Sequence, residues 1–428
     1  MAVDKQVDST QLDADLTSVA NAIRTKGGTS ASLAFPADFV SAIAAIPSGG
    51  GSADEADIND VCFWDYDGSL LYSYSAAEFA NLSELPANPS HNNLTAQGWN
   101  WSLSDAKTFV SENGFLDIGQ LYVTTDGKTH IHIVVSDRRY VKITLVGSAS
   151  GNITIDWGDE SPTQTNSGTS STAYEHTYAA AGSYDITLAV STGLCTIKEL
   201  SAYDMGIYRS INIGTGIKLN GGCFNKTYMM KNASFPLSCD VSTFGGSNIG
   251  IECFIFPSAA LTAESSLSLC TMKAICFPKQ SNIYAGYGTF GNNMSLIRVS
   301  PTVGRNGAGW PVQVFLSNKS LRNFRITDGV TGFGNANDVQ SLNSLKSVTI
   351  PSSISTIPNN SFTDVYCLKD VHMKKTTPPT LSGTSVFTNH PADFVIYVPY
   401  SADQSILNAY KAASNWSSFA SYMQEESQ

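Results

Sequence analysis

Two carboxylates separated by one residue follow an apolar run in the segment Asp65-Tyr66-Asp67-Gly68-Ser69. An aspartate at the end of a buried strand can act as a nucleophile, and a second carboxyl group beside it can supply a proton. The same residues suit a tight turn between two strands, because Asp-Gly favours the left-handed backbone of a hairpin. The segment therefore has a catalytic interpretation and a structural one.

The spacing resembles the Asp-x-Asp-x-Thr signature of haloacid-dehalogenase-type phosphatases, in which the first carboxylate is the nucleophile and the second the general acid. That resemblance implies a parallel sheet, a downstream lysine and a late acidic pair that holds Mg²⁺. The sequence after Ser69 lacks the alternating strands and helices of such a sheet, and no suitably placed lysine follows. We interpret Asp67-Gly68 as a hairpin turn. We predict no catalytic residue, no cofactor and no enzymatic activity.

His130 and His132 lie two residues apart on a predicted strand, so both rings point to the same face. Such pairs from three chains can surround a metal ion. The alternative is a pair of surface or cross-strand histidines, and the chain provides no third ligand for a metal. We predict no resident metal and keep the two histidines as weak candidates.

Two other groups have both a binding and a structural interpretation. The aromatic faces of Trp99 and Trp101, with His91 nearby, suit either a sugar platform or a small core. The acidic residues of one turn suit either a Ca²⁺ site or an ordinary acidic turn, and they are Asp156, Asp159 and Glu160.

The composition limits the classes of function. The chain has 428 residues, 42% of them apolar and only 14% charged, with a net charge of -11. This charge disfavours nucleic acid and anionic membranes as partners. No apolar run is long enough to span a membrane, and the first residues lack the pattern of a secretory signal, so we expect synthesis in a cytoplasm without membrane insertion. The eight cysteines form no CxxC pair and predict buried thiols.

The elements that position these residues fall into modules. Apolar residues at helical spacing predict two short helices within residues 1–48, which must dock on their own copies or on another protein to be stable. Residues 49–60 form a Gly/Ser linker. Residues 61–136 predict a small α+β unit, with helices at 76–83 and 105–112 and with strands at 119–124 and 129–135 on either side of Asp126-Gly127.

Residues 137–192 contain only strand and turn patterns. Trp157-Gly158-Asp159 forms one motif, and a second runs through His176, Tyr178, Gly182 and Tyr184. Together they resemble the PKD domain, a small Ig-like β-sandwich. The resemblance implies a spacer or adhesion module without an active site.

Residues 193–400 repeat a short motif with apolar residues at i, i+3 and i+5, most clearly at 345-LKSVTIP-351. The motif recurs about every 23 residues, which predicts a solenoid whose coils must stack to bury their apolar faces. Further copies start at residues 208, 230, 251, 272, 294, 321 and 368. The pattern resembles the BspA-like leucine-rich repeats of bacterial surface proteins, and residues 401–428 resemble the helical cap of that family.

Positions i+1, i+2 and i+4 of each repeat face outward, and six of the eight residues at i+1 are basic. Stacked coils turn them into a column that can hold an anionic cell-wall polymer or an acidic glycan. The alternative is a solvated face of the repeat. The candidate binding residues, with two arginines at i+4 included, are Arg209, Lys231, Lys273, Arg298, Arg322, Arg325, Lys346 and Lys369.

The blocks 16–46 and 64–106 resemble segments of tail proteins from phages and prophages of gut Firmicutes. We therefore expect a multidomain, mainly β virion protein that is made in the host cytoplasm and assembled into the tail. The resemblance implies attachment to other tail or baseplate proteins through residues 1–48, a homotrimer, and a repeat domain that binds a host cell-surface glycan or protein. The alternatives are a bacterial cell-surface leucine-rich-repeat adhesin and a tail-associated glycan hydrolase.

Overall fold

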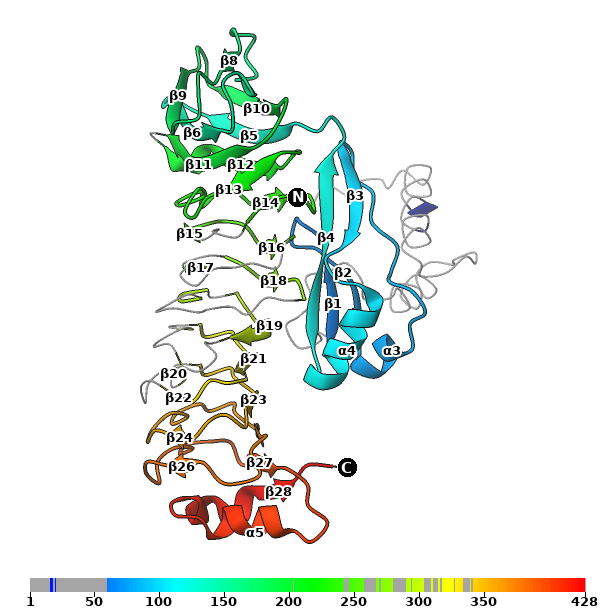
Figure 1. The fold of residues 1–428 in the computed structure, drawn as a ribbon, viewed down its shortest axis with the longest axis vertical. Coiled ribbons are helices and arrows are strands. Elements are labelled where there is room, and N and C mark those ends of the chain that lie inside the picture. Colours follow the sequence, from blue (N-terminus) through cyan, green and yellow to red (C-terminus); the bar gives the residue numbers. More distant parts are fainter. Residues whose placement is uncertain are drawn as a thin grey trace, which may run out of the picture. The chain divides into compact units, whose positions relative to one another are not determined.

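The structure of the chain is a computed structural model. It describes residues 16–17, 20, 60–202, 204–241, 246–257, 267–268, 271–279, 290–293, 295–303, 309–310, 315, 318–326, 328–333, 339 and 342–427. Most of the predicted N-terminal helices and of the linker lies outside these residues. Residues 59–69 and 73–428 form one compact unit, and residues 1–58 with 70–72 form the other. The predicted mainly β chain with a C-terminal solenoid is confirmed, and the solenoid has about seven turns (Figure 1).

A small α+β module opens the described part of the chain. Its sheet has the strand order β2-β1-β4-β3, with β1 and β4 parallel. Ser75 and Glu78 form a capping box that starts one helix, and Ser102 caps the other, which ends at Gly114. The elements are β1 (Val61–Trp64), β2 (Leu70–Tyr74), α3 (Ala76–Ala80), β3 (Leu94–Trp99), α4 (Leu103–Asn113) and β4 (Leu116–Thr124).

The strand predicted at 129–135 is present as β5 (Thr129–Val135), but it lies in a different sheet from β4. It pairs antiparallel with β10 (Gly182–Val190) and β12 (Tyr208–Asn212). Gly127 has the positive φ of +71° that the Asp-Gly turn requires. The turn therefore joins the module to the next sheet, and β4 and β5 do not form a hairpin.

Two sheets follow, with the strand orders β14-β12-β5-β10-β7-β8 and β13-β11-β6-β9. Their alternating apolar residues share one hydrophobic core, which includes Trp157, Ile186 and Ile197. The remaining strands of these sheets are β6 (Tyr140–Gly147), β7 (Ile153–Asp156), β8 (Gln164–Thr165), β9 (Thr172–Thr177), β11 (Cys195–Ala202), β13 (Ile217–Leu219) and β14 (Asn232–Ser234).

The first solenoid coil continues both of these sheets. After the 3-10 turn η1 (Met205–Ile207), β12 pairs with β5 on one side and with β14 on the other, and β13 pairs in parallel with β11. A solenoid that ended freely would expose a row of unpaired backbone groups. The sheets that precede the solenoid satisfy those groups at its N-terminal end, so the sequence boundary at 192/193 lies inside one continuous structure.

Parallel strands stack from coil to coil in two lanes. The first lane contains β16 (Cys253–Ile255), β18 (Ala274–Cys276), β19 (Arg298–Val303), β21 (Asn323–Ile326), β23 (Ser347–Ile350), β25 (Asp370–Met373) and β27 (Val395–Val398). The second contains β15 (Gly246–Ser247), β17 (Leu267–Ser268), β20 (Gly309–Trp310), β22 (Gly332–Phe333), β24 (Thr356–Ile357) and β26 (Thr380–Leu381). Leu345, Val348 and Ile350 are all buried, as the i, i+3, i+5 pattern predicts.

A run of aromatic rings links the coils inside the solenoid. Phe254 lies 4.5 Å from Phe256, whose ring stacks on Phe277 at 4.9 Å and 9°. At the C-terminal end, α5 (Ser405–Ala412) and the 3-10 helix η2 (Trp416–Tyr422) bury Tyr410 and Trp416. The predicted helical cap also contains a strand, β28 (Met423–Glu425), which pairs in parallel with β27.

One repeat starts two residues later than predicted. Arg298 pairs in register with Asn323, and the backbone N–H of Arg322 donates to the carbonyl of Ile297. These pairings place Leu296, not Met294, at position i, and Leu296 is fully buried. Arg298 therefore occupies position i+2, which also faces outward. The register shifts between Arg298 and Thr302, where extra residues interrupt the simple repeat.

Candidate binding groove beside the docked module

The α+β module packs against the outward face of the first solenoid lane. The side chain of Asn100 donates to the carbonyls of Phe256 and Cys276, at 3.4 and 3.1 Å, and the indole of Trp101 donates to Phe277 at 2.6 Å. At Gly119 of β4 a Cβ atom would collide with the side chain of Ile255. The missing side chain thus lets the side chain of Ile255 pack directly against the backbone of β4.

A buried ion pair holds this contact. Arg298 donates to the carboxylate of Asp117 through Nε at 3.0 Å and Nη2 at 2.8 Å, and the indole of Trp64 donates to the same carboxylate at 2.8 Å. The two charged residues are only 7% and 1% exposed. Burial opposes the charge of Arg298, but the adjacent carboxylate outweighs it and raises the pKa of Arg298. Arg298 thus connects the module to the solenoid.

A groove of about 440 Å³ opens where the cover provided by the module ends. Asn113 and Phe115 form one wall, and outward positions of β21, β23 and β25 form the floor, among them Arg325 and His372. Arg325 is 9% exposed, and its Nη1 donates to Oδ1 of Asn113 at 2.9 Å. Its guanidinium lies over the ring of Phe115 at 4.3 Å. The volume lies in the range typical of small-ligand sites.

Charged groups border the groove on its far side. Glu426 of the C-terminal cap contacts His372 at 2.9 Å and Lys374 at 3.5 Å. The ring of His372 also stacks on Tyr397 at 4.9 Å and 8°. Glu426 is thus already engaged by two nitrogen groups of the same rim.

The predicted basic column does stack from coil to coil. Backbone hydrogen bonds connect Arg209 to Lys231 at one end, and Arg322 to Lys346 and then Lys369 at the other. Arg209 also donates to the carbonyl of Gly206. Most of the column is therefore aligned as the repeat predicts.

Several cations of the column contact acidic residues of the chain. Glu252 lies 3.5 Å from Lys231 and 2.8 Å from Lys273, and Lys369 is paired with Asp393. The lysines neutralise Glu252 in turn: their hydrogen bonds outweigh its burial and lower the pKa of Glu252. Arg322 is half-buried and Lys346 exposed. These acidic partners reduce the positive potential that the basic column would have without them.

Asp65, the first carboxylate of the opening motif, is enclosed by donors. It is 2% exposed and accepts from the hydroxyl of Tyr122 at 2.9 Å and from the backbone of Tyr66 at 2.8 Å, and His91 Nε2 lies 2.7 Å away. Burial and the charge of Asp65 raise the pKa of Tyr122. Asp65 is therefore engaged as a structural acceptor inside the module.

The turn itself differs in detail from the prediction. Gly68 donates to the carbonyl of Asp65 at 3.1 Å, and the N–H of Asp65 donates to the carbonyl of Ser69 at 2.9 Å. Within 65–69 only Gly68 has positive φ, +86°. This is a three-residue connection with glycine in the left-handed position, rather than a two-residue Asp-Gly turn.

The remaining candidates make separate contacts. His130 lies 3.1 Å from Asp126, whereas His132 lies 2.8 Å from Asp185. Within the described residues no cluster of three or more His, Cys, Asp or Glu side chains could hold a metal ion. The indole of Trp99 donates to the carbonyl of Pro86 at 2.9 Å, and its ring lies 4.8 Å from Phe63. Trp101 is 5% exposed, so both tryptophans support the module's packing.

The described thiols are mostly enclosed. Cys367 is exposed, and six further cysteines that form no disulfide are buried, at 62, 195, 223, 239, 253 and 276. Burial raises the pKa of Cys195 to about 12, so this thiol is protonated and unreactive at neutral pH.

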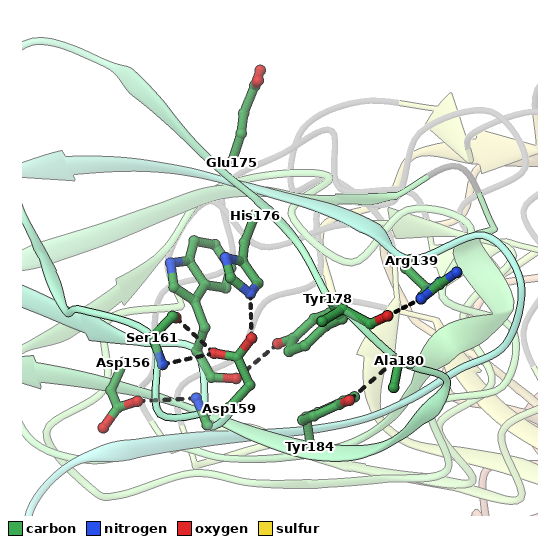
Figure 2. Close-up of polar contacts among 12 residues, drawn as sticks. Arg139, Asp156, Asp159, Ser161, Glu175, His176, Tyr178, Ala180 and Tyr184 are labelled. Atoms are coloured by element: carbon green, nitrogen blue, oxygen red, sulfur yellow. Dashed lines mark hydrogen bonds and ion pairs between the residues drawn. The ribbon is translucent and has the colours of Figure 1, made fainter.

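The acidic turn at Asp159 is a closed hydrogen-bond network (Figure 2). One carboxylate oxygen accepts from the hydroxyl of Ser161 at 2.6 Å, and the other lies 2.7 Å from His176 Nε2. The ring of His176 stacks on Trp157 at 5.0 Å and 12°, and the hydroxyl of Tyr178 donates to the carbonyl of Trp157 at 2.8 Å. Both carboxylate oxygens of Asp159 are therefore already engaged by groups of the protein.

This network predicts a pH-dependent stability. Burial opposes ionisation of Asp159, but hydrogen bonds from Ser161 and His176 outweigh it and lower the pKa of Asp159. A lowered pKa stabilises the fold above the unfolded value near 4, and this stabilisation is lost as pH falls through the folded value. We expect Asp159→Asn to lower the free energy of unfolding by about 1–2 kcal/mol at pH 7. In urea titrations the difference in the free energy of unfolding between Asp159→Asn and wild type should be smaller at pH 3.5 than at pH 7. A difference that stays constant between the two pH values would contradict this prediction.

The sequence contains a signal for the docked module that the predictions above did not use. In two consecutive repeats the outward positions i+2 and i+4 are small or apolar, and all four residues are buried: Cys253, Ile255, Ala274 and Cys276. In the later repeats the same positions are polar, as in Ser347 and Thr349. A local loss of polarity on an outward face predicts a covering element.

No protein-family model matches the sequence, and no curated protein matches it.

Proposed function

We propose that the protein is a non-enzymatic tail component of a virion that binds the surface of a host cell. The groove beside Arg325 supports this proposal most directly. It lies on a rigid lane of stacked strands, and a polar cleft on such a platform suits recognition of an extended surface polymer. The segment 1–48 attaches the chain to other tail or baseplate proteins in this proposal.

The two sheets that precede the solenoid act as a PKD-like, Ig-like spacer in this account. The motif residues Trp157, Asp159, His176 and Tyr178 lie together in one network, which supports the resemblance. The coils that follow represent BspA-like leucine-rich repeats, supported by the burial of positions i, i+3 and i+5. The ligand is a cell-surface glycan or protein, and trimeric assembly multiplies weak sites into high avidity.

The alternatives are a bacterial cell-surface adhesin and a tail-associated glycan hydrolase. The engagement of Asp65 by three donors disfavours the hydrolase, because a nucleophilic carboxylate must reach its substrate. If the protein only binds, incubation with cell-wall polysaccharide releases no reducing ends, from either the wild type or Asp65→Asn. Release by the wild type that Asp65→Asn abolishes would favour the hydrolase.

Mass spectrometry of purified virions tests the location. Peptides of this chain should appear in the tail fraction in a fixed ratio to the other tail proteins. Their absence from virions, together with their presence on the bacterial surface, would establish the adhesin alternative.

A further inference from the structure

Arg325 differs from the other arginine that contacts the module. Arg298 meets the Asp117 carboxylate at 2.8 Å, whereas Arg325 has no ion-pair partner among the described residues. Of its five N–H donors, one bonds to the neutral Asn113 at 2.9 Å, and Nε is buried without an acceptor. A cation that is 9% exposed, with no counter-charge among the residues that the structure describes, is unfavourable for the fold alone.

The surroundings of Arg325 keep its guanidinium charged and leave N–H groups for a ligand. Burial first, and then the positive charge of Arg298, lower the pKa of Arg325 to about 9, so the guanidinium remains charged at neutral pH. Phe115 at 4.3 Å and Phe109 at 5.9 Å lie against the guanidinium. Contact through the faces leaves in-plane N–H groups for hydrogen bonds, and this edge matches a carboxylate or phosphate.

None of the described acidic residues that line the groove forms an ion pair with Arg325. Glu426 is engaged by His372 and Lys374. Glu112 and Asp328 also line the groove, but both are exposed residues of its rim. Lys374 adds a second cation to the lining. The floor also presents Asn323, Ser347 and Thr349, whose amide and hydroxyl groups suit the hydroxyl groups of a sugar.

We propose that this groove binds an anionic saccharide, with the carboxylate or phosphate of the ligand seated on Arg325. The proposal rests on the proposed surface-binding function and specifies its ligand class. The carboxylate of a uronic acid and the phosphate of a polyol-phosphate polymer present the same chemistry to a guanidinium.

Isothermal titration calorimetry of the full chain distinguishes the two sources. The probes are trigalacturonate, a glycerol-phosphate oligomer and the neutral trisaccharide maltotriose. We expect at least one anionic probe to bind and maltotriose to bind at least about tenfold more weakly, with binding that weakens as NaCl rises from about 50 to 300 mM. The anionic probe that binds more tightly identifies the source of the charge.

Arg325→Met is the decisive variant, because methionine is similar in length and can keep the packing against Phe115. It should weaken the anionic probe about tenfold or more, and Arg325→Lys should retain part of the affinity. Lys346→Ser, an exposed change outside the groove, should leave binding unchanged. Unaltered binding by Arg325→Met, equal binding of maltotriose, or no binding of either anionic probe would overturn the inference. If the wild type still sediments with cell envelopes in that last case, the proposed function survives and only the ligand class is wrong.

Discussion

Replacing Arg298 by methionine is expected to lower the free energy of unfolding by about 3–5 kcal/mol. The change leaves the carboxylate of Asp117, 1% exposed, without its cationic partner. Among the described residues, the indole of Trp64 at 2.8 Å would remain as the side-chain donor. An uncompensated buried charge is among the few causes of a loss this large. Urea unfolding monitored by tryptophan fluorescence measures it.

Two controls make this prediction specific. The double variant Asp117→Asn with Arg298→Met removes both charges and keeps an acceptor for Trp64, so it should be more stable than Arg298→Met alone. Arg325→Met removes an arginine that has no ion-pair partner in the described part of the chain, and it should change stability by less than about 1 kcal/mol, or increase it. If Arg298→Met and Arg325→Met lowered the free energy of unfolding equally, the assignment of Arg298 alone to a stabilising ion pair would be wrong.

Phe256→Ala should destabilise the solenoid by about 3–5 kcal/mol, the usual range for removing a buried aromatic ring. Phe256 is fully buried and contacts both Phe254 and Phe277, so its loss leaves a cavity between coils. Because each coil of a solenoid is stabilised by its neighbours, the weakened junction should also broaden the unfolding transition. Circular dichroism during urea unfolding records both effects.

Phe256→Leu, which fills part of the cavity, should lose clearly less than Phe256→Ala. Tyr366→Ala provides a surface comparison, because Tyr366 is 58% exposed and should change stability by no more than about 0.5 kcal/mol. If Phe256→Ala resembled Tyr366→Ala, the ring would not lie in the core.

The repeat pattern predicted the solenoid because its information is local. Val348 and Ile350 enter the core through the alternation of β23, Leu345 lies buried just before that strand, and the regular coils repeat this arrangement. The same logic predicted the hairpin after Asp65 and the helix caps at Ser75 and Ser102. In the repeat around Arg298 the i, i+3, i+5 template also fits Met294, Ile297 and Val299, so the repeat was placed two residues too early.

A local loss of polarity marks the covered face of the solenoid, but the identity of the element that covers it was beyond a local pattern. Asp117 and Arg298 are 181 residues apart in sequence, and nothing in either neighbourhood identifies the other. Arg298 and Arg325 therefore looked like members of one solvated basic column, although both are buried. The parallel pairing of β1 and β4 was missed for a related reason. The intervening β2, α3, β3 and α4 do not follow the regular βαβ alternation that sequence patterns detect.

Sedimentation of the full chain with cell envelopes from gut Firmicutes tests the central claim most directly. The account predicts that wild type and Lys346→Ser co-sediment equally, that Arg325→Met loses about tenfold in apparent affinity, and that NaCl reduces the binding of the wild type. Retention of Arg325→Met at the wild-type level, or no retention of the wild type by any envelope, would contradict the assignment of the groove as the surface-binding site.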